Sequence, residues 1–322
     1  MSPRTELRSA RIVPDCCGVT MHTGQLAISV GQVRDLVADQ FPQWRELPVS
    51  EVVSAGTDSA IFRIGEHYSA RFPLEPRAAA AADRKLRAEA DAARELAGRT
   101  RFATPEPVAI GQPGEGYPLP WSVQTWLTGT IADGEYLSES RTFARDLAEF
   151  IGGVRLIDTR GRTFEGKGRG GDLTRHDEWM ETCFSRSQGL LDVLRLRRLW
   201  AALRELPREA PDAMTHGDLM PGNLLVSAGR LTGVLDVGGL KAADPALDLV
   251  GAWHLFGPAA RDVLREILGS DDLEWQRGKA WAFQQAMGLV WYYADSNPVM
   301  SVTGRRTLGR ILADELRGGD TA

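Results

Sequence analysis

The chain has 322 residues, which is enough for two domains or for one domain of two lobes. Its formal net charge of -5, with 43% hydrophobic and 25% charged residues, is typical of a globular protein and argues against nucleic-acid binding, which usually needs a basic patch. The cysteines Cys16, Cys17 and Cys183 have neither disulfide-framework nor metal-ligand spacing and are interpreted as reduced thiols. With no apolar run of about 20 residues and no signal-peptide pattern, the sequence predicts a cytoplasmic protein.

The first residues differ from the rest of the chain. Residues 1–20 mix charge, proline and a cysteine pair without a regular period, and we expect residues 1–25 to be a poorly ordered extension. A more regular stretch begins at Met21, which is a candidate for the natural start. Apolar residues then recur at helical spacing over 29–41, so we expect an amphipathic helix that Pro42 ends.

A group of strands follows. Residues 52–72 are rich in β-branched and aromatic residues with glycine turns, which predicts strands. In the last of them, alternation places Tyr68, Ala70 and Phe72 on one face and Arg71 on the other.

The small lobe is completed by one helix and two more strands. Residues 78–97 are alanine-rich, contain neither glycine nor proline, and are expected to form a helix. Strands are expected over 108–110 and 121–126. We therefore place an N-terminal lobe at residues 26–127.

The remaining residues, 128–322, are expected to form a larger helical lobe. The glycine-rich, charged stretch 160–175 predicts an exposed loop, and short strands are expected over 224–226 and 231–237. Helices are expected over three stretches: 140–157, 176–206 and 246–316.

The stretch 215-THGDLMPGNLLVSAGRLTGVLDVGG-239 carries the residues suited to chemistry. Asp218 lies in a loop before a strand, Asn223 follows five residues later, and Asp236 ends the next strand. The hairpin therefore returns a second carboxylate to the edge where the first carboxylate and the amide lie. Such oxygen ligands suit Mg²⁺, and the remaining carboxylate can accept a hydroxyl proton, as phosphoryl transfer requires.

These motifs resemble a known family. His216-Gly217-Asp218-x-x-x-x-Asn223, followed by Asp236-Val237-Gly238, resembles the catalytic loop and metal-binding Asp of the protein-kinase-like fold. The His-Gly-Asp form and Asp244-Pro245-Ala246-Leu247-Asp248-Leu249 resemble the aminoglycoside phosphotransferase family, which also holds macrolide and other antibiotic kinases. The resemblance covers nearly all of the chain from Met21 and implies an α+β fold of two lobes, a β-rich lobe with one main helix and a larger helical lobe.

The resemblance implies a role for each matching residue in the catalytic loop. Asp218 is expected to be the catalytic base, and Asn223 and Asp236 the Mg²⁺ ligands. His216 is expected to brace the loop and not to act as an acid or base. Asp248 is expected to hold the loop through hydrogen bonds.

On the nucleotide side, Arg71 stands where most kinases place a lysine that holds the phosphates. Because arginine has a planar fork and not a compact ammonium, the exchange is not automatically conservative. We expect Arg71 to bind phosphate, with a surface salt bridge as the alternative. Glu89 is its expected acidic partner, and Asp91 and Glu95 are the alternatives.

The remaining nucleotide contacts are expected in two segments. Gly56 and Thr57 would belong to the loop over the phosphates. Thr125 and Leu127 would offer backbone groups to the purine, while Trp126 either lines that pocket or fills the core. One departure from the family is Val237, where a phenylalanine is usual, which leaves any packing role of that residue in doubt.

Acidic residues of the helical lobe are candidates for binding a cationic aminosugar. For each of them alone, we favour the interpretation as a helix N-terminal acid that the dipole stabilises. They form two groups: Asp177, Glu178 and Glu181, and Asp271, Asp272 and Glu274.

The sequence therefore predicts a kinase that uses Mg²⁺ and ATP or GTP to phosphorylate a hydroxyl of a small molecule. An aminoglycoside-type antibiotic is the first candidate acceptor. A macrolide, a peptide antibiotic or a metabolic alcohol are alternatives, as is a non-catalytic, nucleotide-binding regulatory protein. Neither a nucleic acid nor a membrane is expected as a partner.

Overall fold

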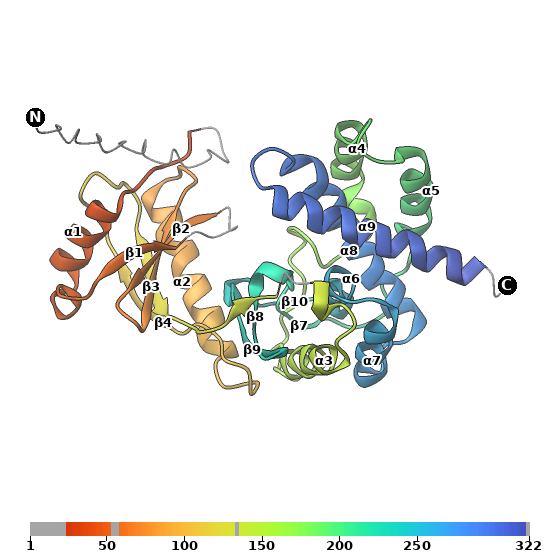
Figure 1. The fold of residues 1–322 in the computed structure, drawn as a ribbon, viewed down its shortest axis with the longest axis horizontal. Helices are drawn as coiled ribbons and strands as arrows, with labels where there is room; N and C mark the ends of the chain where they lie inside the picture. Colours follow the sequence, from red (N-terminus) through yellow and green to blue (C-terminus); the bar gives the residue numbers. More distant parts are fainter. Residues whose placement is uncertain (1–23, 53–57, 133–134, 320–322) are drawn as a thin grey trace, which may run out of the picture.

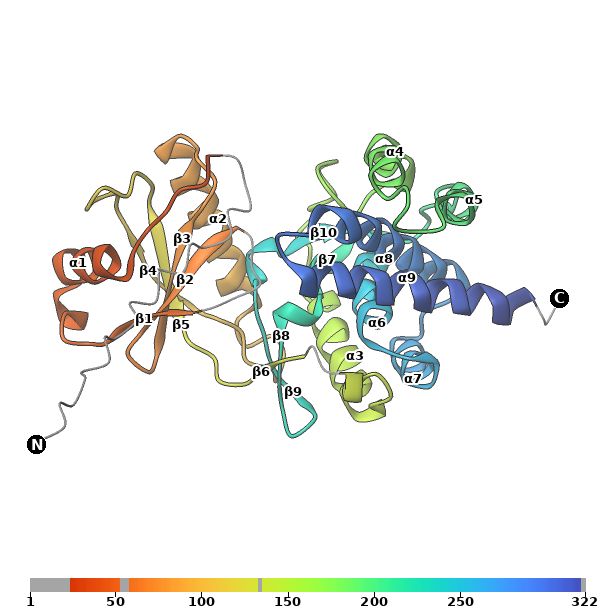
Figure 2. The ribbon, with the colours of Figure 1, turned by 45° about the horizontal axis from the view of Figure 1, so that its top comes forward.

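The computed structural model describes residues 24–52, 58–132 and 135–319, which form two lobes (Figures 1 and 2). The predicted extension before residue 24, the candidate start Met21, and the expected phosphate-loop residues Gly56 and Thr57 lie outside the described residues.

The smaller lobe contains an antiparallel sheet of five strands in the order β1-β2-β3-β5-β4. Helix α1 begins with a capping box between Ser29 and Gln32 and lies on the side away from the larger lobe, whereas α2 faces the larger lobe (Figures 1 and 2). The elements are α1 (Val30–Gln40), β1 (Val49–Val52), β2 (Ser59–Ile64), β3 (Tyr68–Pro73), α2 (Ala79–Leu96), β4 (Pro107–Gly111) and β5 (Trp121–Thr125).

The predicted alternation along β3 is confirmed. Ala70 and Phe72 are fully buried, and the ring of Phe72 stacks on Trp121 with centroids 4.7 Å apart. Arg71 therefore lies on the opposite face, where it lines the cleft between the lobes. The apolar face of β3 belongs to the core of the small lobe.

The larger lobe is mainly helical (Figure 1), and the seven helices that its described part contains include α8 and α9 as the longest. The expected helix over 176–206 is interrupted, because Gly189 adopts a positive φ of 77° and Asp192 caps a new helix. The helices are α3 (Arg141–Arg155), α4 (Asp177–Arg186), α5 (Val193–Leu203), α6 (Val250–Leu255), α7 (Pro258–Leu268), α8 (Asp272–Tyr292) and α9 (Pro298–Gly319).

Two small sheets carry the loops that face the smaller lobe. Strands β6, β8 and β9 form one sheet, and β7 pairs with β10 in another. Strands β6, β7 and β10 were not predicted from the sequence. The strands are β6 (Thr130–Ile131), β7 (Ala213–Thr215), β8 (Leu224–Ser227), β9 (Arg230–Val234) and β10 (Lys241–Ala243), and the 3-10 turns η4 (Pro221–Asn223), η5 (Val237–Gly239) and η6 (Pro245–Leu249) lie between them or directly after them.

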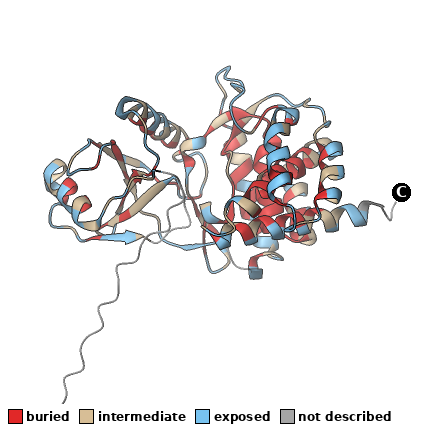
Figure 3. Cartoon of the chain, turned by 90° about the horizontal axis from the view of Figure 1, so that it is seen from above, coloured by how far each residue is buried: buried red, intermediate tan, exposed pale blue. Residues whose placement is uncertain are grey.

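Most residues of helix α8 are buried. Figure 3 shows buried residues concentrated in the interior of the larger lobe. The helix packs against α9 and against η6, which includes Asp248. None of the helices in the described ranges is both long and apolar enough to cross a membrane.

Gly278 of α8 allows the close approach to η6, because a Cβ there would lie 2.5 Å from Leu249 Cβ and 3.3 Å from the Ala246 carbonyl oxygen. We expect Gly278→Ala to lower the free energy of unfolding by about 1–3 kcal/mol through overpacking. Gly309→Ala on α9 is the control, because a Cβ there meets nothing within 4 Å.

Denaturant unfolding monitored by circular dichroism measures both changes. The control should be stabilised by about 0.5–1 kcal/mol, since alanine has the higher helix propensity. Equal stabilisation by both alanines would contradict the packing account.

Candidate functional site

A cleft of about 290 Å³ lies between the lobes. One wall is formed by β3 and α2 of the smaller lobe, and the other by the loop after β7 and the segment after β9. Its lining includes four carboxylates and four cationic side chains, which suits a polyanion bound with a cation: Asp58, Glu89, Asp218 and Asp236, and Arg71, Arg77, Lys85 and Lys241.

The loop after β7 is held from below by a buried carboxylate. Asp248 is 0% exposed and accepts the backbone N–H of His216 at 2.9 Å and of Gly217 at 2.8 Å. Burial raises the pKa of Asp248, and these N–H donors and nearby His216 oppose that rise. Gly217 has a φ of +83°, a conformation that glycine adopts without a steric cost. The predicted structural role of Asp248 agrees with these contacts.

His216 braces the loop, as its contacts indicate. Its Nδ1 accepts the backbone N–H of Asp218 at 3.3 Å, so its Nε2 is the nitrogen that donates to the Leu235 carbonyl oxygen at 2.9 Å. The imidazole thus joins the loop of Asp218 to the segment just before Asp236. Since both ring nitrogens are engaged and the residue is 1% exposed, His216 is placed to position its neighbours.

The Asp218 carboxylate points into the cleft and receives three side-chain donors. Arg169 Nη2 and Gln285 Nε2 both donate to Oδ1 at 2.8 Å, and Asn223 Nδ2 donates to Oδ2 at 3.1 Å. Burial alone would raise the pKa of Asp218, but the Arg169 charge and hydrogen bond outweigh it and lower that pKa below its usual value. The carboxylate is therefore ionised at neutral pH and able to accept a proton.

Asp236 lies in the left-handed region, with φ 55° and ψ 44°, a conformation in which Asp is enriched among non-glycine residues. The preceding Leu235 N–H donates to the Asn223 carbonyl oxygen at 2.7 Å, which joins the segments that carry the two predicted metal ligands. Asp236 lines the cleft, and Asn223 is hydrogen-bonded to the lining residue Asp218. Asn223 directs its amide nitrogen to Asp218, which leaves its Oδ1 for a cation.

A carboxylate and an amide oxygen fit Mg²⁺, which is commonly held by one or two carboxylates together with substrate phosphates and water. Within the described ranges, no three His, Cys, Asp or Glu side chains gather into a complete metal site. Asp236 and Asn223 thus fit a cation that arrives with a phosphate group.

The cations of the small lobe are paired differently from the prediction. Arg71 Nη2 lies 3.1 Å from Asp236 Oδ1, while Glu89 pairs with Lys85 at 3.6 Å. Glu89 also packs against Gly238, where a Cβ would lie 2.8 Å from the Glu89 Cβ. The acidic partner of Arg71 is thus the predicted metal ligand, and both Arg71 and Glu89 still line the cleft.

The alternatives Asp91 and Glu95 point elsewhere, because they pair with Arg94 and Arg162. Both ion pairs hold exposed or surface arginines. Neither acid lines the cleft.

The junction between the lobes holds the residues expected at the purine. The backbone N–H of Thr125 donates to the Glu106 carbonyl oxygen at 2.9 Å, and the Thr125 hydroxyl accepts the backbone N–H of Glu106. Leu127 packs on β9, where its Cδ1 is 3.1 Å from the position of a Cβ on Gly233. Trp126 lies under the Arg63 guanidinium at 4.9 Å. Purine binding by this segment stays a prediction.

Val237 is 4% exposed and belongs to the core of the larger lobe. Valine in place of the usual phenylalanine therefore keeps an apolar side chain in the core at this position.

Three side chains around Asp218 were missed by sequence reasoning. Arg169 lies in the stretch that was expected to be an exposed loop, and Gln285 lies in a stretch that was expected only to be helical. Lys241, whose Nζ donates to the Arg169 carbonyl oxygen at 3.0 Å, lies on the unpredicted strand β10. The cationic residues beside the glycines of 160–175 were the one available signal, but no periodicity indicated their partners.

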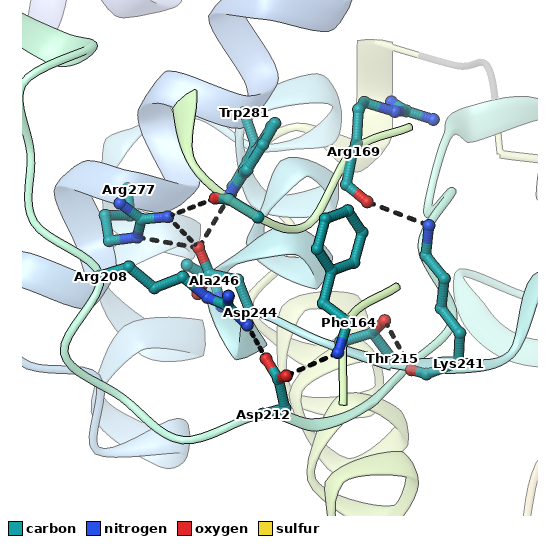
Figure 4. Close-up of polar contacts among 11 residues, drawn as sticks. Phe164, Arg169, Arg208, Asp212, Thr215, Lys241, Asp244, Ala246, Arg277 and Trp281 are labelled. Carbon is teal, nitrogen blue, oxygen red and sulfur yellow. Dashed lines mark hydrogen bonds and ion pairs between the residues drawn. The ribbon is translucent and has the colours of Figure 1, made fainter. Parts of the chain in front are cut away.

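The loop that carries Arg169 is anchored by a buried ion pair (Figure 4). Arg277 of α8 donates to Asp244 Oδ2 at 2.6 Å, and the two side chains are 4% and 2% exposed. Trp281 donates to the same oxygen at 3.0 Å. Arg277 also donates to the Gly171 carbonyl oxygen at 2.9 Å, so the pair holds the backbone two residues after Arg169.

The start of the same loop is held by Asp212, which accepts the Phe164 N–H at 2.7 Å and pairs with Arg208 (Figure 4). The Phe164 ring lies 5.5 Å from Lys241 Nζ. The stretch 160–175, expected to be an exposed loop, is exposed over most of its length, but Gly170, Gly171 and Leu173 are buried.

Four of the six acids proposed for a cationic acceptor pair with arginines. Asp177 pairs with Arg204, and Glu181 with Arg197. Asp272 pairs with Arg265 and Glu274 with Arg155, while Asp271 caps α8 and Glu178 is exposed on α4. None of these acids lines the cleft.

Comparisons with known proteins give a consistent result. Residues 50–281 match the model of the phosphotransferase enzyme family. An aminoglycoside 3'-phosphotransferase of Escherichia coli is 40% identical over 71 residues, which cover 21% of this chain and 26% of that relative. The chain thus matches about a quarter of the length of this curated relative.

Similarity of structure extends much further. The GDP complex of an aminoglycoside 2'-phosphotransferase superposes with a TM-score of 0.66 at 18% identity, covering 89% of this chain and 100% of that one. A macrolide 2'-phosphotransferase of Brachybacterium faecium gives a TM-score of 0.56 at 17% identity, covering 85% and 97%. The predicted two-lobed, protein-kinase-like α+β fold is confirmed.

We expect Arg277→Met to lower the free energy of unfolding by about 3–5 kcal/mol, because it leaves the Asp244 carboxylate buried and unpaired. The control is Arg87→Met, which breaks an exposed ion pair with Asp83 and should cost less than about 1 kcal/mol. Thermal and urea unfolding measure both variants. A loss at Arg277 no larger than at Arg87 would contradict the assigned role.

Proposed function

The chain belongs to the phosphotransferase enzyme family, and we propose that it is a Mg²⁺-dependent kinase that moves the γ-phosphoryl group of ATP or GTP to a hydroxyl of a small molecule. The observation that carries the proposal is a cleft lined by Asp218 and Asp236 from one lobe and by Arg71 from the other, with Asn223 hydrogen-bonded to Asp218. These groups are a base, a cation-binding pair and a phosphate-binding cation, the parts that phosphoryl transfer requires.

In the proposed step, the acceptor hydroxyl donates its proton to the Asp218 carboxylate as its oxygen bonds to the γ-phosphorus. The bond from the γ-phosphorus to the bridging oxygen breaks, and the nucleoside diphosphate leaves with that electron pair. Oδ2 of Asp218 accepts only one side-chain donor within the described residues, so it has a lone pair for the hydroxyl. Arg169 and Gln285 hold Oδ1 and thereby orient the carboxylate.

Asp236 and Asn223 are the residues that would hold Mg²⁺. When bound, the ion neutralises charge on the phosphate oxygens and orients them. Arg71 is proposed to contact phosphate, with Glu89 and Lys85 beside it on α2. Gly56 and Thr57 over the phosphates, and Thr125 and Leu127 at the purine, belong to the same proposal by resemblance.

The acceptor is proposed in two forms. An aminoglycoside-type antibiotic is supported by the curated relatives' names. A macrolide, a peptide antibiotic or a metabolic alcohol is the alternative acceptor. The pairing of four of the six candidate acids with arginines supports an acceptor with fewer ammonium groups than an aminoglycoside. A cytoplasmic location is part of this proposal, and the free buried thiol of Cys183 agrees with it.

Asp218→Asn is expected to lower kcat by about a hundred- to ten-thousand-fold, because the amide cannot accept the hydroxyl proton. Nucleoside diphosphate release with Mg²⁺ and ATP or GTP is measured over aminoglycosides, macrolides, peptide antibiotics and amino alcohols. Nucleotide affinity should change little, which separates loss of the base from misfolding. Undiminished turnover in the variant would contradict the catalytic role, and nucleotide binding without any turnover in the native chain would favour the regulatory alternative.

Arg71→Met should raise the KM for the nucleotide about 10- to 100-fold, because charge-assisted hydrogen bonds to phosphate are lost. Arg71→Lys keeps the charge and should recover part of that loss. The matched control, Arg84→Met on the exposed face of α2, should leave KM unchanged. If Arg71→Met behaves like the control, Arg71 is a surface salt-bridge residue.

A further inference from the structure

The following inference concerns the acceptor of the proposed phosphoryl transfer, and it rests on that proposed function. We propose that Arg169 and Lys241 form an anion-binding subsite beside Asp218, so that the acceptor carries a carboxylate or phosphate group next to its reacting hydroxyl. The two cations lie on adjacent segments, the glycine-rich loop and β10, which a hydrogen bond from Lys241 Nζ to the Arg169 carbonyl oxygen joins at 3.0 Å.

Arg169 is held directly beside the proposed base, Asp218. Its Nη2 donates to Asp218 Oδ1, and a hydroxyl bound at Oδ2 would share that carboxylate with the guanidinium. Substituents next to the hydroxyl would then lie close to this cation, at a range where an opposite charge is favoured and a like charge disfavoured. The Arg169 side chain is 23% exposed, so it is partly shielded from water and its charge is weakly screened.

Arg169 also has unused donor capacity. A guanidinium carries five N–H groups, and Nη1 of Arg169 is buried without a hydrogen-bond partner in the described part of the chain. A buried donor without a partner is costly, so a ligand oxygen within its reach would be stabilised. Arginine also matches the two oxygens of a carboxylate or phosphate with its planar fork.

Lys241 supplies the second cation. It lines the cleft beside Gly217 and Asp218, and its ammonium has three N–H groups, of which one is directed to the Arg169 carbonyl oxygen. Burial and the charge of Arg169 lower the pKa of Lys241, so an anion between the two cations would favour its charged form. The face of the Phe164 ring lies on its other side.

The loop that carries Arg169 is held in place by buried contacts, as a binding subsite requires. The ion pair of Asp244 with Arg277 holds Gly171, and Asp212 holds Phe164, so both ends of the loop that presents Arg169 are fixed. An ammonium-rich acceptor would meet two cations here, while three of the candidate acids for binding it are paired with arginines on α5, α7 and α3.

The test uses four probes of one carbon skeleton that differ in charge: glycerate, glycerol phosphate, glycerol and serinol. Their binding to the full chain is measured by ligand-observed NMR, with Mg²⁺ and a non-hydrolysable ATP analogue saturating the nucleotide site. We expect glycerate or glycerol phosphate to bind at least tenfold more tightly than serinol, and the tighter of the two identifies the anionic group.

Three variants test the residues. Arg169→Met should remove the preference for the anionic probes, and Arg169→Lys should retain most of it. Lys167→Met removes a charge from the exposed part of the same loop and should leave the preference intact. The subsite is overturned if serinol or glycerol binds as tightly as the anions, if no probe binds, or if Arg169→Met keeps the preference.

Phosphoryl transfer to the same probes, with ATP in place of the analogue, separates the two proposals. Tighter binding of the anionic probes without transfer to any hydroxyl compound would contradict the proposed function, but it would still support the anion-binding subsite. Transfer that prefers cationic acceptors would contradict the subsite and leave the proposed function.

Discussion

The arrangement of the cleft depends on one buried carboxylate, Asp248, whose two oxygens accept the N–H groups of His216 and Gly217. Buried N–H groups without partners are rare because they are costly, so this carboxylate dictates where the loop of Asp218 can lie. His216 extends the constraint, because its ring links the Asp218 N–H to the carbonyl of Leu235. The His216 ring thereby holds both the proposed base, Asp218, and the segment just before the proposed metal ligand, Asp236.

Helix α8 fixes the Asp218 carboxylate to the core of the larger lobe through two sets of contacts. Gln285 donates directly to Asp218 and accepts a hydrogen bond from His254, whose pKa burial lowers to about 4, so that the ring is neutral and acts as a structural donor. Arg277 acts through the glycine-rich loop, by way of Gly171 and Arg169. Both sets of contacts start from a helix whose residues are mostly buried, so the core of the larger lobe fixes the orientation of Asp218.

The sequence was sufficient to predict most of the helices and strands, and to single out the residues that belong to a local motif. The period of α1, the alanine-rich α2 and the alternation on β3 each follow from local propensity, and the spacing of Asp218, Asn223 and Asp236 follows from one hairpin. Contacts between distant segments could not be predicted: Arg169 meets Asp218, 49 residues away, and Gln285 meets it from 67 residues away. Such pairs are set by tertiary packing, which leaves no periodicity in a single sequence.

Phosphorus-31 NMR of the complete reaction tests the central claim most directly. With Mg²⁺, ATP or GTP, and the hydroxyl compounds offered one at a time, the account predicts a new phosphate monoester that grows in step with the nucleoside diphosphate. Its formation should require both Mg²⁺ and the carboxylate of Asp218. Release of inorganic phosphate in place of an ester, or ester formation that continues without Mg²⁺, would contradict the account.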